Sequence, residues 1–147
     1  MKSEPSDYSI DDLSRDKREM WDGIRNYQVR NMIRDDMKAG DKALFYHSNT
    51  AEIGVVGEMK LVGKTYPDPT QFDKKNKHFD AKSDPSNPRW LCIDVAYKSK
   101  LPRIVTLNEM KGEKQLEGLR ILQKGNRLSI TPVAEKHYQL IVKMSYK

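Results

Sequence analysis

The sequence predicts an α+β fold in which a small, mostly antiparallel sheet or partly closed barrel carries short helices on its outside. Strand-like segments cluster in the middle of the chain, helix-like segments lie on both sides of them, and the two types do not alternate. A doubly wound parallel sheet needs that alternation, so it is disfavoured. The length of 147 residues fits one domain, which we place at residues 1–147.

Two helices are predicted before the first long strand. Ser9 and Asp12 have the spacing of a capping box, which starts a short helix in "YSIDDLSRD". The segment "MWDGIRN" then reads as a loop. Apolar residues follow Val29 at helical spacing and Gly40 is a natural stop, so a second helix is predicted over residues 27–38.

Three strands are predicted next, in "DKALFYHS", "EIGVVGEMKLVGKTY" and "RWLCIDVAYKSKL". The third alternates best, because Leu91, Ile93 and Val95 point to one face while Cys92 and Asp94 point to the other. This alternation is typical of a half-buried strand.

The C-terminal third adds short helices and one more strand. Thr106 and Glu109 form a second capping box, "QLEGLRIL" fits one more helical turn, and "RLSITPV" reads as a short closing strand. The last helix is predicted in "EKHYQLIVKM". Ala134 stands before it, so this helix should lack a side-chain cap worth roughly 1 kcal/mol.

The segment from Pro67 to Pro88 interrupts this plan with 22 residues, four prolines and almost no apolar periodicity. Loops of this length inside a compact domain are usually functional or disordered. Phe72, His78 and Phe79 argue against disorder. We therefore predict an ordered flap that carries the lysines Lys74, Lys75 and Lys77.

The formal net charge is +6, and the surplus lies mainly in the last third of the chain. Residues 101–147 carry nine Lys or Arg against four Asp or Glu, whereas residues 1–50 carry nine against ten. A basic surplus favours polyanions such as nucleic acid, but charge that only serves solubility gives the same balance. Charge alone leaves both interpretations open.

No window approaches the roughly 18 consecutive apolar residues of a membrane span, and "MKSEPSDYS" contains no apolar signal segment. Cys92 is the only cysteine, which excludes an intrachain disulfide and a cysteine-based zinc site. We therefore expect a cytoplasmic protein, or a nuclear one in a eukaryote, that is a monomer without a cofactor, a metal or a membrane partner.

A hydrolytic site is poorly supported. His47 and Ser48 are adjacent, but neighbours on a strand point to opposite faces, and no Gly-x-Ser-x-Gly turn is present. Cys92 lies in the middle of a strand and reads as a small buried hydrophobe. The three histidines lack metal-ligand spacing, and no glycine-rich phosphate loop opens a helix. We predict no catalytic residue.

A pocket for a flat nucleobase is better supported. Such a base is held by stacking on an aromatic face and is read along its edge by short polar groups. The stretch "WDGIRNYQVRN" combines both kinds of residue, and others stand at strand ends and loop starts. Some of the aromatic residues could equally belong to the core. The predicted pocket residues are Ser3, Glu4, Trp21, Asn26, Tyr27, Tyr46, His47, Ser48, Asn49, Tyr66 and Asp68.

The partner implied by such a pocket is DNA or RNA that carries a modified base. Cations beside the pocket would contact the flanking phosphates. The predicted phosphate contacts are Lys2, Arg30, Lys74, Lys75, Lys77, Arg89, Lys124 and Arg127.

Several motifs together resemble the EVE domain family over almost the whole chain. They are "MKSEP", "YSIDDL", "WDGIRNYQVRN", "MKAGDKALFYHSN", "IGVVG", "YPDPT", "PRW" and "RLSITPV", in the family's order and spacing. The resemblance implies a PUA-like fold, which is a mixed, mostly antiparallel pseudo-β-barrel surrounded by short helices. EVE domains are similar to YTH domains, which bind methylated adenine in an aromatic cage, so the resemblance also implies a reader of modified bases.

The resemblance also implies roles for particular positions. Trp21 corresponds to the cage tryptophan of the YTH pattern. The segments Lys2–Glu4 and Phe45–Asn49 correspond to two strand ends that supply edge contacts, and Tyr66–Asp68 begin the flap that closes the pocket. Arg127 lies in the "RLS" motif near the C-terminus.

One departure and two other functions stay open. Family members usually carry several apolar residues ahead of "KSEP" as a first strand, whereas only Met1 precedes it here. Either part of an edge strand is missing, or the chain starts further upstream. Related PUA-like amidohydrolases of the ASCH type act on acetylated cytosine, so an enzyme that removes a base modification is one alternative. A sensor of free nucleosides or other small molecules is the second.

Overall fold

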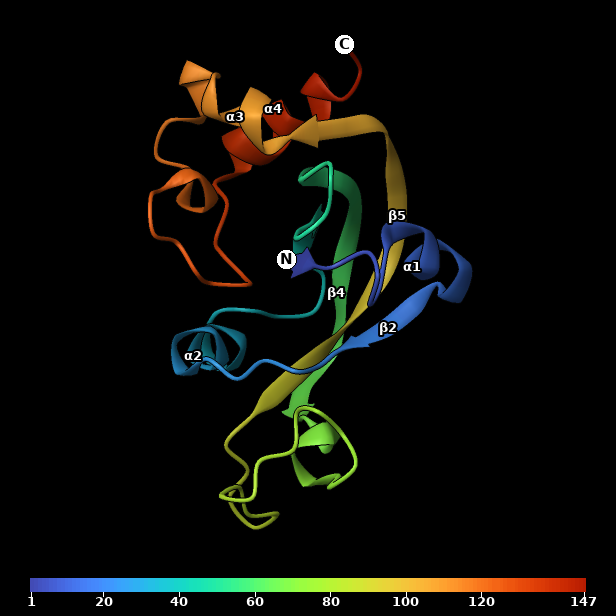
Figure 1. Cartoon of the computed structure of the whole chain (residues 1–147), viewed down its shortest axis with the longest axis vertical. Coiled ribbons are helices and arrows are strands. Elements are labelled where there is room, and N and C mark those ends of the chain that lie inside the picture. Colours follow the sequence, from blue (N-terminus) through green and yellow to red (C-terminus); the bar gives the residue numbers. More distant parts are fainter.

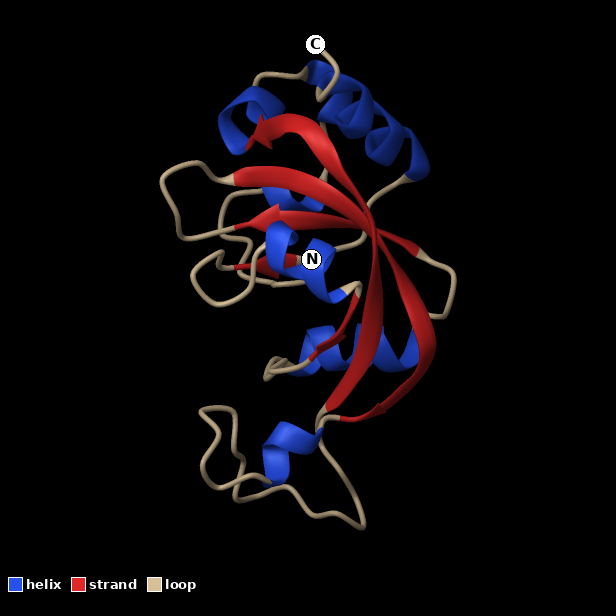
Figure 2. Ribbon diagram, turned by 90° about the vertical axis from the view of Figure 1, so that its right-hand side faces the viewer, coloured by secondary structure: helices blue, strands red, loops and turns tan.

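The computed structural model describes residues 1–147 and is built around one five-stranded sheet (Figures 1 and 2). The strand order is β1-β3-β4-β5-β2, and all neighbouring strands are antiparallel except β1 and β3, which are parallel. The strands are β1 (Lys2–Ser3), β2 (Arg18–Trp21), β3 (Lys42–His47), β4 (Gly54–Pro67) and β5 (Leu91–Thr106).

The sheet confirms the predicted α+β class but not the closure of the barrel. β1 and β2 are the two edge strands and do not pair with each other, so the pseudo-barrel is open. β1 has only two residues and β2 only four, so these edge strands are too short to pair with each other and close the barrel. The two longest strands, β4 and β5, form the twisted centre of the molecule (Figure 2).

Four α-helices and three short 3₁₀-helices surround the sheet. Both predicted capping boxes are present, at Ser9 and Asp12 and at Thr106 and Glu109. Ala134 precedes the last helix without any side-chain cap, as predicted. The α-helices are α1 (Ile10–Asp16), α2 (Tyr27–Asp35), α3 (Leu107–Lys111) and α4 (Glu135–Met144), and the 3₁₀-helices are Pro69–Phe72, Lys114–Leu116 and Arg120–Leu122.

The predictions are wrong in three places: one strand is missed, one predicted strand does not form, and one helix ends earlier than predicted. The residues Arg18–Trp21, which lack apolar alternation, form β2 because β5 supplies a partner for each of them. The segment "RLSITPV" is irregular: Lys2 N donates to Ser129 O at 2.8 Å, but Pro132 has no N–H with which to extend a ladder. Helix α2 ends at Asp35, before the predicted residue 38. The N–H of Lys38 donates a hydrogen bond to the Asp41 carboxylate in a turn, so it does not extend the helix.

Two hydrophobic clusters occupy opposite faces of the sheet. Phe45 belongs to the cluster under α1 and α2, while its neighbours Leu44 and Tyr46 belong to the cluster under α3 and α4. Figure 1 shows the same division, with α1 and α2 beside the middle of the sheet and α3 and α4 together at one end. The segment between β4 and β5 lies at the opposite end.

Candidate nucleic-acid interface

The segment between β4 and β5, residues 68–90, is an ordered flap that is held to the body by a buried carboxylate. Asp68 has no exposed surface. Its Oδ1 accepts hydrogen bonds from the backbone N and the hydroxyl of Thr70, and its Oδ2 accepts from Gly23 N at 2.8 Å and Arg25 Nη1 at 3.1 Å. Asp68 therefore joins the start of the flap to the loop that follows β2.

A second buried side chain fixes the end of the flap. Gln71 is fully buried, and its amide donates to the carbonyls of Asp68 and Trp90 while its Oε1 accepts from Ser83 and from Trp90 N. The Trp90 indole donates to Asp80 at 2.7 Å. These bonds close the flap on itself, so its order does not depend on apolar periodicity.

Arg25 fastens the middle of the flap, at His78, to the loop after β2. Its guanidinium donates to His78 O at 2.7 and 2.9 Å and also reaches Thr70 and Asp68. Gly23 has a φ of +80°, and a Cβ there would lie 2.6 Å from His78 Nε2. A side chain at position 23 would both strain the backbone and push His78 away.

The carboxyl groups beside this network have shifted pKa values. Burial alone would raise the pKa of Asp68, but the hydrogen bonds from Thr70, Gly23 and Arg25 outweigh it, and the net shift is downward. Burial, followed by the charge of Asp68, raises the pKa of Asp22. Sequence reasoning missed Asp22, Arg25 and Gln71 as structural contributors, although the first two lie in the stretch "WDGIRNYQVRN".

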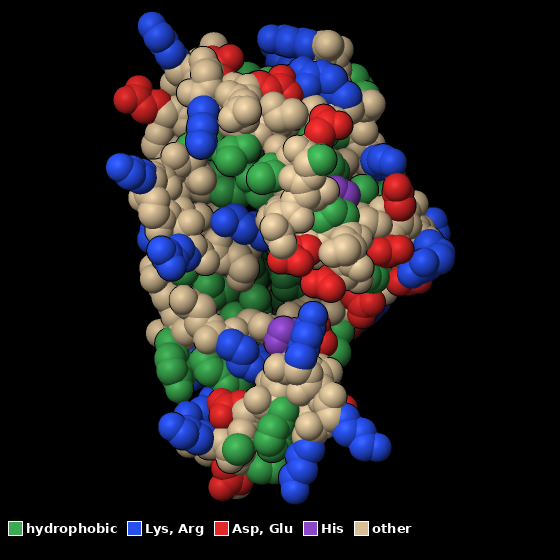
Figure 3. All heavy atoms as spheres, viewed as in Figure 1, with side chains coloured by type: hydrophobic (Ala, Val, Ile, Leu, Met, Phe, Trp, Pro, Cys, Tyr) green, Lys and Arg blue, Asp and Glu red, His purple; other side chains and the backbone are tan.

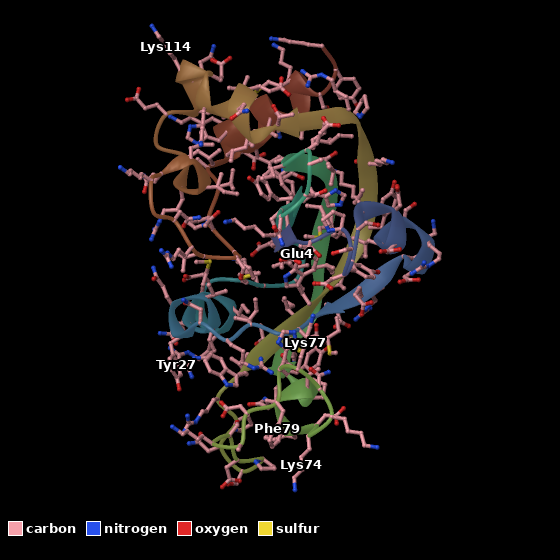
Figure 4. All side chains as sticks on the ribbon, in the orientation of Figure 1. Glu4, Tyr27, Lys74, Lys77, Phe79 and Lys114 are labelled. Atoms are coloured by element: carbon pink, nitrogen blue, oxygen red, sulfur yellow. The ribbon has the colours of Figure 1, made fainter.

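The surface is hollowed between the flap and the body of the molecule, with hydrophobic side chains at the floor (Figure 3). We call this depression the front hollow. In the same orientation, Glu4 lies on its upper side and Lys77 of the flap on its lower side (Figure 4). Lys77 Nζ lies 3.7 Å from the carboxylate of Asp7, which follows Glu4 in a turn, so the flap meets the body again here.

The ends of β1 and β3 bring five predicted pocket residues together. Ser3 pairs with His47, Ser48 N donates to Ser3 O at 3.0 Å, and Asn49 Nδ2 donates to Glu4 Oε1 at 3.2 Å. Asn49 has a φ of +51°, which turns the chain at this point. The hydroxyl of Ser3 is already engaged, because it donates to Tyr8 O.

The other predicted pocket residues lie in different environments. Trp21 is 8% exposed and packs edge-on against Phe45, with ring centroids 5.4 Å apart, in the larger core cluster. Tyr46 is buried in the other cluster, on the opposite face of β3. The Tyr66 hydroxyl donates to Asp94, and the pKa of that hydroxyl is raised by burial and by this bond.

His47 and Asn26 serve local structure. His47 Nε2 accepts from Ile10 N at 3.2 Å, so this ring ties α1 to the end of β3. Burial lowers its pKa. Asn26 caps α2 by accepting from Val29 N at 3.1 Å.

Tyr27 lies outside the front hollow, on the surface of the same face (Figures 3 and 4). The residue is 51% exposed, and its ring lies against Trp90, with centroids 4.7 Å apart and an angle of 31° between the planes. The Arg30 guanidinium lies 4.9 Å from the Tyr27 ring centroid and donates to Arg89 O at 2.9 Å.

Most of the predicted phosphate contacts are exposed. Lys74, Lys75 and Lys77 project from the flap, and Lys124 and Arg127 are exposed in the segment before α4. Lys2 is half-buried, and this burial lowers its pKa. In Figure 3, Lys and Arg side chains lie both above and below the front hollow.

A separate cavity of about 580 Å³ lies between the sheet and the C-terminal segment. Fifteen of its 22 lining residues are hydrophobic, among them Met32, Leu44 and Ile141, and Tyr46 is the one predicted pocket residue that lines it. Its polar lining residues include Asp36, Asp41 and Glu135, but none of them belongs to the predicted pocket, so we do not place the base there.

The remaining chemical groups offer no second site. Cys92 is buried, and burial raises its pKa to about 12, so a thiolate is disfavoured. No group of three or more His, Cys, Asp or Glu side chains is arranged to hold a metal ion. No helix has the length and apolar character needed to cross a membrane.

The open sheet, its short flanking helices and the flap define an α+β domain of the PUA-like class. The profile of the EVE domain matches residues 1–144, and the chain belongs to the EVE domain family. It is 38% identical to human thymocyte nuclear protein 1 over 100% of this chain and 73% of that protein. The chain is also 38% identical to a Schizosaccharomyces pombe protein over 92% of this chain and 58% of that one.

Solved structures agree with this assignment. A Pseudomonas syringae protein superposes with a TM-score of 0.95 at 40% identity, covering 99% of this chain and 97% of that one. The human THYN1 protein, in complex with DNA that contains 5-methylcytosine, superposes with a TM-score of 0.93 at 37% identity, covering 100% of this chain and 96% of that one.

Proposed function

We propose that this protein is a non-enzymatic nucleic-acid-binding module that reads a modified base in the front hollow. The observation that carries the proposal is the hollow itself, with a hydrophobic floor, Glu4 on one side and Lys77 of the hydrogen-bonded flap on the other. The related human THYN1 protein forms a complex with DNA that contains 5-methylcytosine, which supports the same class of ligand here.

Glu4 is the residue best placed to read the edge of the base. It is half-buried, and only one of its oxygens takes part in a side-chain hydrogen bond, the 3.2 Å bond from Asn49. An ionised carboxylate accepts hydrogen bonds and donates none. Glu4 should therefore favour bases that present an exocyclic amine, such as cytosine, over uracil or thymine, which present a carbonyl there.

Trp21 is the aromatic wall in this proposal, in line with its match to the cage tryptophan. Because it packs against Phe45 in the core, its complete removal would also destabilise the fold by roughly 3–5 kcal/mol. Tyr46, Tyr66 and Asp68 are left out of the proposed site, because they are buried elsewhere or have their polar atoms already engaged.

The flap is the second wall of the proposed site, and its lysines would contact the phosphates beside the base. Their ammonium groups are exposed, so they can meet a backbone without losing a buried partner. The 3.7 Å contact between Lys77 and Asp7 is exposed and contributes little to stability. Nucleic acid can therefore displace it at small cost.

The test is a binding panel of otherwise identical oligonucleotides that carry methylated, hydroxymethylated or unmodified cytosine, with matched uracil strands. We expect tighter binding to one modified base, and we expect Glu4→Gln to narrow the preference for cytosine over uracil, because an amide donates as well as accepts. Glu117→Gln, at an exposed position in the C-terminal third, is the matched control. Equal affinity for all strands would refute the proposal.

One observation favours an enzyme as the second candidate function. Lys2 and Glu4 are two residues apart at the end of β1, and burial lowers the pKa of Lys2, which makes its amine more available as a base. Mass spectrometry of modified nucleosides, including acetylated cytidine, after incubation with excess protein distinguishes the two. Unchanged nucleoside supports a reader, and a converted product supports an amidohydrolase.

A further inference from the structure

The face that carries the front hollow also carries an exposed aromatic ring that the proposed pocket does not use. Tyr27 is 51% exposed, and among the large hydrophobic residues only Tyr146 is more exposed. It occupies the first turn of α2, and Figures 3 and 4 place it on the same face as the hollow. A half-exposed ring beside a nucleic-acid site is a surface on which a base can stack.

The ring is rigidly supported from below. Tyr27 lies against Trp90, whose indole is held by Asp80 and whose backbone N is held by Gln71. Arg25, which is itself fixed to the flap, places its guanidinium 5.5 Å from the Trp90 ring centroid. A platform held in this way loses little conformational freedom when a ligand binds.

Two arginines belong to the surroundings of the platform: Arg30 lies over the Tyr27 ring, and Arg89 precedes Trp90 in the chain. Arg30 reaches over the Tyr27 ring, and its hydrogen bonds go to a carbonyl and to the Asn31 amide, not to a carboxylate. Arg89 forms no salt bridge. Neither guanidinium group is within salt-bridge distance of a carboxylate, although Asp35 and Asp80 interact electrostatically with Arg30 and Arg89. Both can still attract phosphate, and Arg30 also offers a planar group on which a base can stack.

We propose that Tyr27, with Arg30 and Arg89, binds a nucleotide that flanks the modified base. This inference rests on the proposed function. It specifies the ligand as a strand of several nucleotides, in which the base next to the modified base stacks outside the pocket. A free nucleoside would fill only the hollow and would miss this contact.

The experiment is a double-mutant cycle in which one change is made in the protein and the other in the DNA strand. Affinity is measured for a five-nucleotide DNA strand with a central 5-methylcytosine, and for the same strand with abasic nucleotides at the four flanking positions. The abasic strand keeps the phosphates and removes the bases that could stack. Wild type and Tyr27→Ala are compared on both strands.

We expect Tyr27→Ala to weaken binding of the full strand by roughly 5- to 100-fold, the range of one lost stacking contact. Binding of the abasic strand should be the same for both proteins. Tyr27→Phe should retain the wild-type affinity. Tyr27→Leu, which keeps an apolar cover on Trp90 but has no aromatic face, should behave like Tyr27→Ala. Tyr146→Ala, at an exposed tyrosine in the C-terminal tail, is the control.

The platform proposal is refuted if the abasic flanks reduce the affinity of wild type and Tyr27→Ala by the same factor. It is also refuted if Tyr27→Leu binds the full strand as tightly as wild type does. The proposed function is refuted by a different result: the protein binds strands with 5-methylcytosine or any other modified base of the panel no more tightly than the unmodified strand. A Tyr27 effect on unmodified strands would then remain measurable, so the two failures are distinguishable.

Discussion

At the scale of single residues, Asp68 fixes the position of the flap relative to the loop after β2. Its buried carboxylate accepts four hydrogen bonds, two from within the flap and two from the loop after β2. A buried carboxylate is stable only when donors surround it in this way. The same bonds make it unable to read a base, although its position in "YPDPT" is part of the family resemblance.

Asp68→Asn should destabilise the protein by roughly 3 kcal/mol, because the amide nitrogen cannot accept and leaves Arg25 or Thr70 without its partner. Chemical denaturation measures this loss. Asp73→Asn, on the exposed part of the flap, keeps the acceptor for Lys75 N and should be close to neutral. Equal losses for the two variants would show that Asp68 does not anchor the flap.

The lowered pKa of Asp68 also gives the flap a pH dependence. A carboxyl group whose folded pKa lies below its unfolded value of 3.8 contributes stability above that pH and loses it as the pH falls through the folded pKa. We therefore expect NMR signals of residues 68–90 to lose their dispersion only below pH 3.8, and at a higher pH than signals of β4 and β5.

At the scale of secondary-structure elements, α1 is coupled to the end of β3 through His47. The bond from Ile10 N to His47 Nε2 requires a neutral ring. Burial lowers the pKa of His47 from its ordinary value of 6.5, so the folded state binds a proton less readily than the unfolded state. Stability from this group is present above pH 6.5 and is lost as the pH falls below it.

His47→Gln should remove that share of the pH dependence, because the amide oxygen can accept from Ile10 N and does not titrate. The midpoint of thermal unfolding at pH 7.5 and pH 5 measures the change. The wild type should lose more between these two values than the variant does. Parallel curves for the two proteins would mean that other groups cause the whole dependence.

The flap is the second element with a testable role. Replacing Lys74, Lys75 and Lys77 together by Gln should weaken binding to modified and unmodified strands alike and reduce the slope of log K against log salt. Lys111, Lys114 and Lys143, at the opposite end of the molecule, give a control variant of equal charge change. An unchanged slope in the flap variant would move the phosphate track to Lys124 and Arg127.

At the scale of the whole molecule, the open sheet leaves two edges that could pair with another copy. Both edges are short, and Arg18 and Glu19 place charges on β2. Short, charged edge strands resist edge-to-edge association. We therefore expect a monomer of 17.1 kDa by light scattering at micromolar concentration, with a mass of twice that value as the contrary result.

Local patterns in the chain were enough to predict the helices with strong caps, the three long strands and the family. Capping boxes and alternation act between residues that are close in the chain, so they can be read directly at Ser9, Thr106 and the strand around Ile93. The ordered flap could also be predicted, because its aromatic residues need a place to pack.

Tertiary structure alone decided which of the marked residues share a site. β2 forms because β5 pairs with it. In "WDGIRNYQVRN", Asn26 caps α2 through its neighbour Val29, but the flap anchor at Gly23 and the surface stack at Tyr27 depend on partners far away in the chain, Asp68 and Trp90. Side-chain type shows what a residue can bind. Only the packing of distant segments fixes whether its polar atoms are already satisfied: one oxygen of Glu4 accepts a side-chain hydrogen bond, whereas both oxygens of Asp68 are engaged.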